Sequence, residues 1–501
     1  MKTCLRNVRL LTMEGDASTD ILIEDTRIAE IGRNLPVVGV TQEIDGTGHL
    51  ALPGLINGHF HSPANMWKGR LPGLPLEIFM LYEVPPLGDV VPSDRLVYVR
   101  TLLGAMEMLK LGITAVQDDA FFVPRPTPGT IDAILTAYRD AGIRATVALD
   151  QPNVVEYEKY PFLKDLLPGD ILREMETAPR QRVEELLELY GHLIGTWHGA
   201  AEGRLRAAVS CSAPHRVTPD YLQALSQLSR EHGLPYYMHI LETRVQRVFG
   251  DAVLGRSLVR YVKDQGVLDR RCNVIHGIWL DDNDLADIAE AGAVIVHNPV
   301  CNLRLGSGIM PFRRIRERAI PVSLGTDEAL ADDTVNLWGA IKMAGLVHNL
   351  TDPDYRTWPA ADEILDCVFA GGARAMGLED RIGALEPGYQ ADITLIDLNG
   401  LAYTPLNDIR RQLVYGETGV NVRMTMVAGQ VVMQEGQLLT VDEDAVKAEA
   451  RDLAAAQAGD MAAAGGIAER LEPYYREMYM RSAATEVGMN RWAMALDSTG
   501  G

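Results

Sequence analysis

The sequence predicts a parallel (β/α)₈ barrel that carries a small β-sandwich domain and a helical C-terminal tail. Three observations support this prediction. Between residues 56 and 375, short apolar runs rich in β-branched residues alternate with helix-length amphipathic segments. β-like patterns flank that region at 1–55 and at 376–440. Residues 441–501 are rich in Ala, Glu and Arg, which is typical of helices.

The two flanking regions are best explained as one β-sandwich built from both termini. Residues 1–55 contain "NVRLLTM" and "DILIEDTRIAEIG", short β-like runs separated by turns. The same pattern returns in 376–440, with "RIGALEPGYQADITLIDLNG" and "NVRMTMVAGQVVMQEGQLL".

The barrel prediction for 56–375 depends on eight strand-like runs. They are the run into His59, "GITAVQD", "IRATVALD", "LRAAVSCSAPH", "LPYYMHI", "CNVIHGI", "AVIVHNP" and "IPVSLGTD". Amphipathic segments such as "DYLQALSQLSREHG" lie between most of them. The tail, 441–501, should be helical and broken near Gly465–Gly466. We interpret it as a packed or oligomer-forming element, and we expect a homo-oligomer.

Composition excludes several classes of function. The 501-residue chain has a net charge of −21, which disfavours a nucleic-acid partner. Its densest basic segment, "PFRRIRER", is typical of a solvated helix face. No uninterrupted apolar run approaches membrane-spanning length and no signal peptide is visible, so we expect no membrane partner and a cytoplasmic location. The five cysteines are scattered without C-x-x-C spacing, which favours a reducing compartment.

Polar side chains gather at the predicted strand ends. In a parallel barrel, catalytic groups collect at the carboxyl ends of the strands. The residues at those positions are His59 and His61 (first strand), His215 (fourth), His239 (fifth), His276 (sixth), His297 (seventh) and Asp327 (eighth). The other histidines fall in helices or connections, so the rule separates two groups.

The His-x-His pair predicts a metal site. On a strand, residues two apart share a face, so both imidazoles of His59 and His61 can reach one cation. A third histidine, His239, and Asp327 at other strand ends complete a ligand set suited to one divalent ion. Zn²⁺ is the preferred ion and Fe²⁺ the alternative.

Glu242 lies three residues beyond His239 in "HILET". A carboxylate beside an activated water can carry a proton to a leaving nitrogen. The alternative is that Glu242 opens the next helix, where acidic residues are favoured. Spacing alone leaves both explanations open.

Together these residues resemble the amidohydrolase superfamily, in particular its cytosine, guanine and adenosine-type deaminases and its triazine hydrolases. The matching segments appear in the family's order over roughly 1–440. They are "PGLINGHFHSP", "MHILET", "VIHGIWL", "VIVHNPVCNLRLGSG", "SLGTDEA" and "GALEPGYQADITLIDL".

The resemblance implies metal binding by His59, His61, His239 and Asp327, with Asp327 also taking the proton of the water. It implies that Glu242 is the proton shuttle and that His276 orients the water or the tetrahedral intermediate. His215 and His297 resemble substrate-contacting positions. Members with two metals bridge them by a lysine on the fourth strand, and "LRAAVSCSAPH" has none, so one metal is expected.

Departures from the family pattern affect the substrate prediction. Glu328 replaces a common small residue after the metal aspartate, where it could contact an amino-bearing substrate or cap a helix. "HNPVCN" also differs from the usual sequence after the seventh strand. Trp67 could line an aromatic-ring site or pack in the core, and the aromatic segment 151–180 is expected to roof the pocket.

Three functions remain open. The first is an aminohydrolase that releases ammonia from a heteroaromatic ring or cyclic amidine, that is, a hydrolase of carbon–nitrogen bonds other than peptide bonds. The second is hydrolytic displacement of chloride, an alkylamine or a thio group from a triazine-like ring. The third is a non-catalytic binding protein on the same fold. Since nitrogen needs a proton to leave, Glu242 favours the first, and the expected partner is a small heterocyclic substrate.

Overall fold

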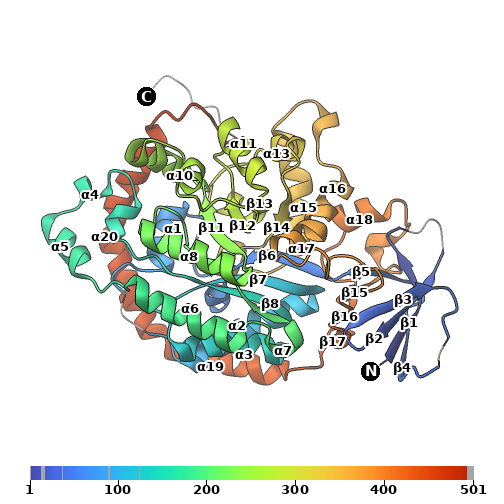
Figure 1. The fold of residues 1–501 in the computed structure, drawn as a ribbon. Helices are drawn as coiled ribbons and strands as arrows, with labels where there is room; N and C mark the ends of the chain where they lie inside the picture. Colours follow the sequence, from blue (N-terminus) through green and yellow to red (C-terminus); the bar gives the residue numbers. More distant parts are fainter. Residues whose placement is uncertain (1, 13–16, 37, 89–90, 123, 494–501) are drawn as a thin grey trace.

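The computed structural model describes residues 2–12, 17–36, 38–88, 91–122 and 124–493. A central barrel joins a small β module on one side, while the long C-terminal helix α20 runs along the opposite side (Figure 1). The ends of the predicted 1–55 and 441–501 segments, residue 1 and residues 494–501, lie outside the described residues.

The barrel strands appear where the alternating pattern predicts them. They are β6 (Leu55–Phe60), β7 (Ile113–Phe121), β8 (Arg144–Asp150), β9 (Leu205–Ala207) with β10 (Val209–Ser210), β11 (Tyr236–Ile240), β12 (Cys272–His276), β13 (Val294–His297) and β14 (Val322–Leu324). All neighbouring strands pair in parallel, in the orders β6-β7-β8-β9 and β10-β11-β12-β13-β14. Since β10 lies beside β8 and β14 lies beside β6, the two sheets close into one barrel.

Helices surround the barrel. Those that follow the strands are α2 (Asp94–Lys110), α3 (Pro128–Ala141), α6 (Val183–Trp197), α8 (Pro219–His232), α10 (Leu258–Asp264), α11 (Asp282–Ala291), α13 (Phe312–Glu317) and α16 (Ala361–Val368). Shorter helices near the strand ends are α1 (Leu76–Glu83), α4 (Leu163–Leu166), α5 (Gly169–Thr177), α7 (Ala200–Gly203), α9 (Arg244–Phe249), α12 (Pro299–Arg304) and α14 (Ala329–Asp332). After them come α15 (Leu337–Val347), α17 (Ala370–Ala375) and α18 (Ile409–Tyr415).

The small module is built from both termini. Its strands are β1 (Lys2–Leu10), β2 (Thr19–Glu24), β3 (Arg27–Gly32), β4 (Gln42–Asp45), β5 (His49–Pro53), β15 (Ile393–Asp397), β16 (Val422–Val427), β17 (Gln430–Gln434) and β18 (Gln437–Leu438). β15 pairs antiparallel with β5, which joins the two halves. Leu5 and Ile21 share a core with Ile393 and Met424, so the predicted union of the termini is confirmed.

The tail is helical to Ala484, but the predicted break near Gly465–Gly466 is wrong. The chain breaks at Gln457, between α19 (Glu443–Ala456) and α20 (Ala458–Ala484), and α20 continues through both glycines. Glycine disfavours a helix interior by about 1 kcal/mol. Packing of the buried α20 side chains against the barrel outweighs that preference.

α20 packs on the segment beside the barrel mouth. Leu471 and Tyr475 of α20 share a core with Ile78 of α1 and with Val155 and Tyr160 of the predicted roof. The rings of Tyr160 and Tyr475 lie 5.3 Å apart, and the Tyr475 hydroxyl donates to Glu156 Oε1 at 3.0 Å. The tail is therefore a packed element that holds the roof in place.

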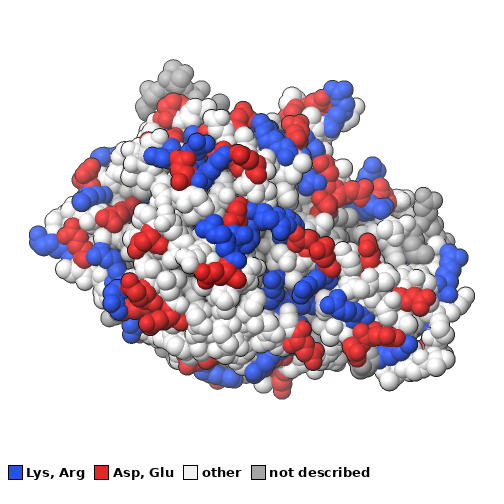
Figure 2. All heavy atoms as spheres, viewed as in Figure 1, with Lys and Arg blue, Asp and Glu red and all other residues white. Residues whose placement is uncertain are grey.

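Charges of both signs are mixed on the surface. On the face in Figure 2, Lys and Arg are interspersed with Asp and Glu. The arginines of the basic segment around α13 are each paired with a carboxylate: Arg313 with Glu363, Arg314 and Arg318 with Asp282, and Arg316 with Asp366. All five cysteines are free and buried. Among the described helices, none combines the length and apolar character that a membrane crossing requires.

Candidate active site

The barrel strands end in sharp turns around the predicted site. His276 and Asp327 adopt left-handed backbone conformations, with φ of 71° and 62°, and Ser212 and Leu241 do so as well, with φ of 59° and 53°. Such conformations cost a non-glycine residue about 1–2 kcal/mol. They persist only where the surrounding structure enforces them, and they cluster at functional sites.

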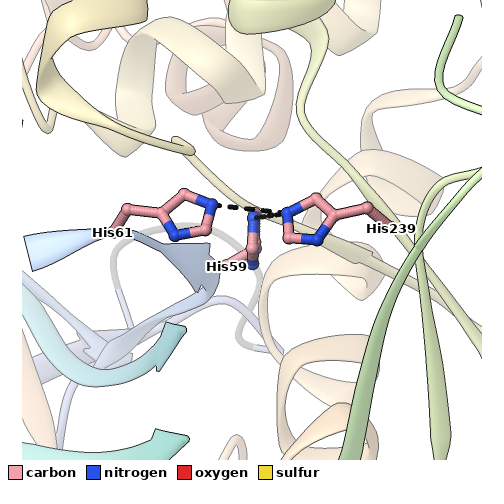
Figure 3. Close-up of side chains that lie close together, drawn as sticks. All are labelled: His59, His61 and His239. Atoms are coloured by element: carbon pink, nitrogen blue, oxygen red, sulfur yellow. Dashed lines mark hydrogen bonds between the residues drawn. The ribbon is translucent and has the colours of Figure 1, made fainter. Parts of the chain in front are cut away.

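The three predicted histidine ligands converge on one point (Figure 3). His239 Nε2 lies 3.2 Å from His59 Nε2 and 3.3 Å from His61 Nε2. All three side chains are buried. Two nitrogens bound to the same tetrahedral Zn²⁺, each at about 2.0–2.1 Å, lie about 3.3 Å apart. The observed spacing is therefore that of ligands sharing one ion.

The other ring nitrogens fix how these imidazoles can bind. His239 Nδ1 donates to the Ser212 carbonyl at 2.7 Å, and His61 Nδ1 donates to the Asp119 carbonyl. A ring that carries its hydrogen on Nδ1 presents an unprotonated Nε2, the form that binds a cation. Burial, followed by the neighbouring imidazoles, lowers the pKa of His59 and His239 well below the ordinary value, which keeps both rings neutral.

Asp327 supplies the oxygen of the set. Its Oδ1 lies 3.6 Å from His61 Nε2 and 3.8 Å from His59 Nε2. Burial acts to lower the pKa of His61, but the carboxylates of Asp327 and Asp119 raise it overall. Three imidazole nitrogens and one carboxylate match the donor set of a divalent ion with an open position. The residues present therefore fit the predicted metal.

Gly325 allows this convergence. It lies just after β14, where the barrel closes against β6. A Cβ at this position would lie 2.4 Å from Asn298 Oδ1 and 2.8 Å from the His59 backbone nitrogen. The Asp327 backbone N–H donates to the His59 carbonyl at 3.0 Å across the same seam.

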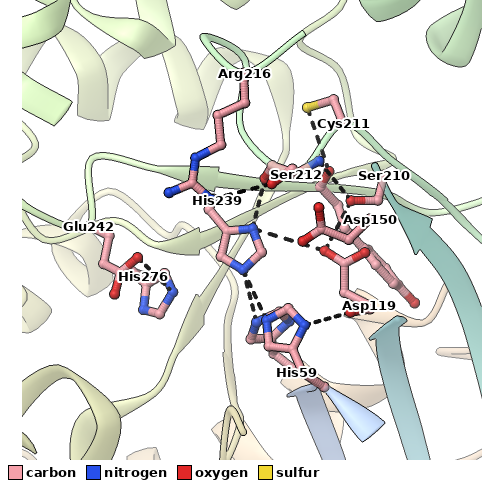
Figure 4. Close-up of polar contacts among 12 residues, drawn as sticks. His59, Asp119, Asp150, Ser210, Cys211, Ser212, Arg216, His239, Glu242 and His276 are labelled. Atoms are coloured by element: carbon pink, nitrogen blue, oxygen red, sulfur yellow. Dashed lines mark hydrogen bonds and ion pairs between the residues drawn. The ribbon is translucent and has the colours of Figure 1, made fainter. Parts of the chain in front are cut away.

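Glu242 and His276 lie beside the candidate ligands His59 and His239 (Figure 4). His276 Nε2 is 3.4 Å from Glu242 Oε2 and 3.6 Å from Asp327 Oδ2, and His276 Nδ1 bonds Asn302 Oδ1 at 2.8 Å. Burial, with a smaller effect from the charge of Asp327, raises the pKa of Glu242 well above its ordinary range. Glu242 Oε1 is buried without a partner among the described residues, so it is free to meet a substrate.

The geometry separates the two explanations for Glu242. α9 begins at Arg244, and Thr243 is the residue whose side chain caps it. Glu242 therefore lies outside the helix, and its carboxyl faces His276 rather than the backbone of α9. Its carboxyl is therefore part of the candidate active site rather than of the α9 cap.

These residues line one cavity of about 790 Å³. His61, His239, Glu242, His276 and Asp327 contribute to its inner end. The segment predicted as a roof contributes much of the wall, through the residues Gln151, Pro152, Val154, Val155, Glu156, Lys159, Tyr160, Glu174, Met175, Thr177, Ala178, Pro179 and Arg180. The cavity has room for a bicyclic ring with a substituent.

Glu328 also lines the cavity. It occupies the N-cap position of α14, but its side chain makes no capping hydrogen bond, so it is not a helix cap in the sense considered from the sequence. Its carboxyl lies near the carboxyl of Glu83, at the end of α1, and the two interact electrostatically. Burial, followed by the charge of Glu83, raises the pKa of Glu328 well above its ordinary range.

Trp67, His215 and His297 are not among the residues that line this cavity. Trp67 packs against the cluster around Leu76 and Phe79. The His215 ring lies tilted against Phe249, with ring centroids 5.0 Å apart. His297 Nε2 lies 3.1 Å from His348 Nε2. Substrate contacts by these three residues remain predictions, and the residues that line the cavity do not support them.

Sequence reasoning missed several polar groups of the site. Asp119 near the end of β7 and Asp150 at the end of β8 lie close enough to His239 to form a group of possible ligand atoms. The rule that located the histidines applies to these two carboxylates as well. His239 Nδ1 is already bonded to Ser212, so we treat Asp119 and Asp150 as neighbours of the site rather than as ligands. Arg216 and Glu83 were also missed.

Comparison with known proteins identifies the family. The pattern of the amidohydrolase family matches residues 50–432. A 5-methylthioadenosine/S-adenosylhomocysteine deaminase from Desulforudis audaxviator is 30% identical over 454 residues, covering 90% of this chain and 97% of that protein. A 5'-deoxyadenosine deaminase from Methanosarcina mazei is 29% identical, with the same coverage of both chains.

Solved structures agree on the fold. Atrazine chlorohydrolase TrzN from Arthrobacter aurescens TC1, complexed with zinc, superposes with a TM-score of 0.78 at 24% identity, covering 90% of this chain and 99% of that one. An adenosine deaminase from Xanthomonas campestris with bound zinc gives 0.77 at 23% identity, covering 90% and 97%.

The chain belongs to the amidohydrolase family, as the resemblance implied. The predicted enzyme class, a hydrolase of carbon–nitrogen bonds other than peptide bonds, is confirmed by the family and its relatives.

Proposed function

We propose that this amidohydrolase deaminates the adenine ring of adenosines that carry a modified 5' position. The main support is the position of Glu242, a buried carboxyl with one free oxygen beside the convergent ligands. A leaving amine must gain a proton, and Glu242 lies where such a proton would be delivered. The relatives that align over nearly the whole chain are deaminases of this substrate class.

His59, His61, His239 and Asp327 would hold one divalent ion, with Zn²⁺ preferred and Fe²⁺ as the alternative. When bound, the ion supplies Lewis-acid activation of the attacking water. The structural neighbours that contain zinc support this choice of ion. The predicted fourth-strand segment, residues 205–215, contains no lysine, which supports a single ion.

The protein side chains would manage the protons. Asp327 accepts a proton from the attacking water, and Glu242 carries it first to the ring nitrogen beside the reacting carbon. A second proton, from the new hydroxyl group, goes to the departing amino group. Water and the aminopurine thus give the oxopurine and ammonia. His276, held by Asn302, would orient the oxygen that attacks.

Displacement of another leaving group from a triazine-like ring is the second candidate, and a panel assay separates the two. Ammonia release is measured with 5'-deoxyadenosine, 5'-methylthioadenosine and S-adenosylhomocysteine, alongside guanine, cytosine, a pterin and atrazine. The proposal predicts that the 5'-modified adenosines have the highest kcat/KM. Chloride release from atrazine without deamination of any nucleoside would overturn it.

The remaining predictions belong to the same proposal. We expect a cytoplasmic enzyme that acts on a small heterocyclic substrate and assembles as a homo-oligomer. We expect no nucleic-acid partner, because the net charge is −21 and the densest basic segment is neutralised by carboxylates.

A further inference from the structure

Arg216 is a buried guanidinium in the wall of the active-site cavity. The residue is 7% exposed and lines the cavity. Its Nε has no hydrogen-bond partner among the described residues. Its side chain makes a single long hydrogen bond, from Nη1 to Ser212 Oγ at 3.4 Å, and no ion pair with a described carboxylate. A group with five donors is therefore left almost unsatisfied.

Two buried arginines away from the cavity have carboxylate partners. Arg144 donates to both oxygens of Asp392, at 2.8 and 3.0 Å. Arg247 is paired with Asp281 and Asp284, each at 3.0 Å. A buried charge without a partner is destabilising. Arg100 is also buried with an unpaired Nε, but it does not line the cavity. Arg216 does line it, so a partner from outside the protein can reach its guanidinium.

The side chain is held in a fixed place. The Arg216 backbone N–H donates to Ala213 at 2.9 Å, and its carbonyl accepts from Asn153 at 3.1 Å. From this loop after β10 the guanidinium extends towards His239, with Glu242 on one side and Asp150 on the other (Figure 4). The missing partner is therefore a group at the inner end of the cavity, beside the reacting centre.

We propose that Arg216 is a specificity-determining residue that donates to an acceptor nitrogen of the substrate's heterocycle. This inference depends on the proposed function, which places an adenine ring at that inner end. Once the ring nitrogen beside the reacting carbon faces Glu242, the ring still has acceptor nitrogens on its other edges. A guanidinium is suited to such acceptors, as its pairing with purine edges in DNA recognition shows.

A carboxylate on the 5' substituent is the less suitable partner. With the adenine ring at the inner end, that substituent would point away from the reacting carbon and towards the cavity mouth. Arg125 and Arg180 line the cavity as exposed residues, so a charged tail entering from solvent would meet them. Arg216 lies deeper, among residues that surround the reacting centre.

The test compares wild type with Arg216→Met, which removes the donors at similar length, and Arg216→Lys, which keeps the charge. Arg260→Met is the matched control, since Arg260 pairs with Asp264 and Asp287 and does not line the cavity. Deamination of 5'-deoxyadenosine is assayed, with 3-deazaadenosine and 7-deazaadenosine as competitive inhibitors. Metal content and circular dichroism confirm that each variant is folded and loaded.

We expect Arg216→Met to raise the KM for 5'-deoxyadenosine about 10- to 100-fold, the effect of losing one charge-assisted hydrogen bond. The inhibition constant of the analogue that lacks the bonded nitrogen should change less than 3-fold, while that of the other analogue rises like the KM. The KM of Arg216→Lys should fall between those of wild type and Arg216→Met, and the KM of Arg260→Met should match that of wild type.

If Arg216→Met raised the KM for 5'-deoxyadenosine and the inhibition constants of both analogues equally, or raised none of them, the role of Arg216 would be overturned. The deaminase function would be left intact. A selective loss of S-adenosylhomocysteine turnover alone would also overturn it, in favour of carboxylate binding. If wild type neither deaminates nor binds any of these nucleosides, the proposed function itself fails, and this assignment fails with it.

Discussion

Glu242 illustrates how one residue's chemistry depends on its surroundings. The carboxyl is buried beside Asp327 and His276, so its pKa lies well above the ordinary range. A raised pKa makes the carboxyl hold a proton more readily, which suits a proton carrier. The same side chain on an exposed helix end would stay ionised.

The first prediction concerns this residue. Glu242→Gln keeps the size and polarity of the side chain but removes its ability to transfer a proton. We expect kcat to fall by about 10²- to 10⁴-fold, with the bound metal unchanged because Glu242 is not a ligand. Steady-state kinetics and metal analysis of the same preparation check this, and a fully active Glu242→Gln enzyme would refute the assigned role.

At the scale of elements, the contact between β14 and β6, which we call the seam, brings the candidate ligands together. His59 lies near the end of β6 and Asp327 follows β14. Gly325, also after β14, packs against His59 without space for a Cβ. Close packing here leaves only glycine as a fit.

The second prediction follows from that seam. Gly325→Ala should displace His59 or Asn298 and lower the metal content. It should also lower the free energy of unfolding by about 1–3 kcal/mol. Gly339→Ala is the control, because nothing lies within 4 Å of the added Cβ in α15, and it should be neutral or slightly stabilising. Equal behaviour of the two variants would contradict the proposed importance of the seam.

The tail is a second element with a role at the site. α20 packs on the roof segment whose residues Val155 and Tyr160 also line the cavity. Leu471→Ala should lower the free energy of unfolding by about 2–5 kcal/mol and raise KM, because the cavity wall loses its support. Leu350→Ala, at a side chain that is 78% exposed, is the control and should change neither. Denaturant unfolding and kinetics are the measurements, and a stability loss with unchanged KM would show that α20 does not brace the cavity.

Sequence periodicity was sufficient for the barrel, the shared β module and the four candidate ligands, since strand ends of a parallel barrel share one rim. It was not sufficient for Glu83, which is the last residue of helix α1 rather than a residue at a strand end. The fold of the intervening chain brings it near Glu328, and periodicity does not predict that approach. The break placed at Gly465–Gly466 failed because packing overrode local propensity. Arg216 carries no periodic signal, and its isolation is visible only in three dimensions.

At the scale of the whole molecule, the site connects separate parts of the barrel. His59 and His61 come from one of its two sheets and His239 from the other. An ion held by all of them would cross-link the sheets and bind the folded chain only, which stabilises it by mass action.

The fourth prediction tests this link. Removal of the metal by a chelator should lower Tm, and added Zn²⁺ should restore it. His239→Ala should show no Zn²⁺-dependent change, while Glu242→Gln should respond like wild type. Differential scanning calorimetry measures all of these, and an identical Tm with and without metal in wild type would contradict the predicted cross-link.

The most direct test of the central claim is anomalous X-ray scattering at the zinc edge from crystals of the metal-loaded protein. The account predicts one strong peak per chain, about 2.0–2.2 Å from Nε2 of His59, His61 and His239 and from a carboxylate oxygen of Asp327. A crystal of active enzyme with no peak among these four side chains, or with its only peak elsewhere, would contradict it.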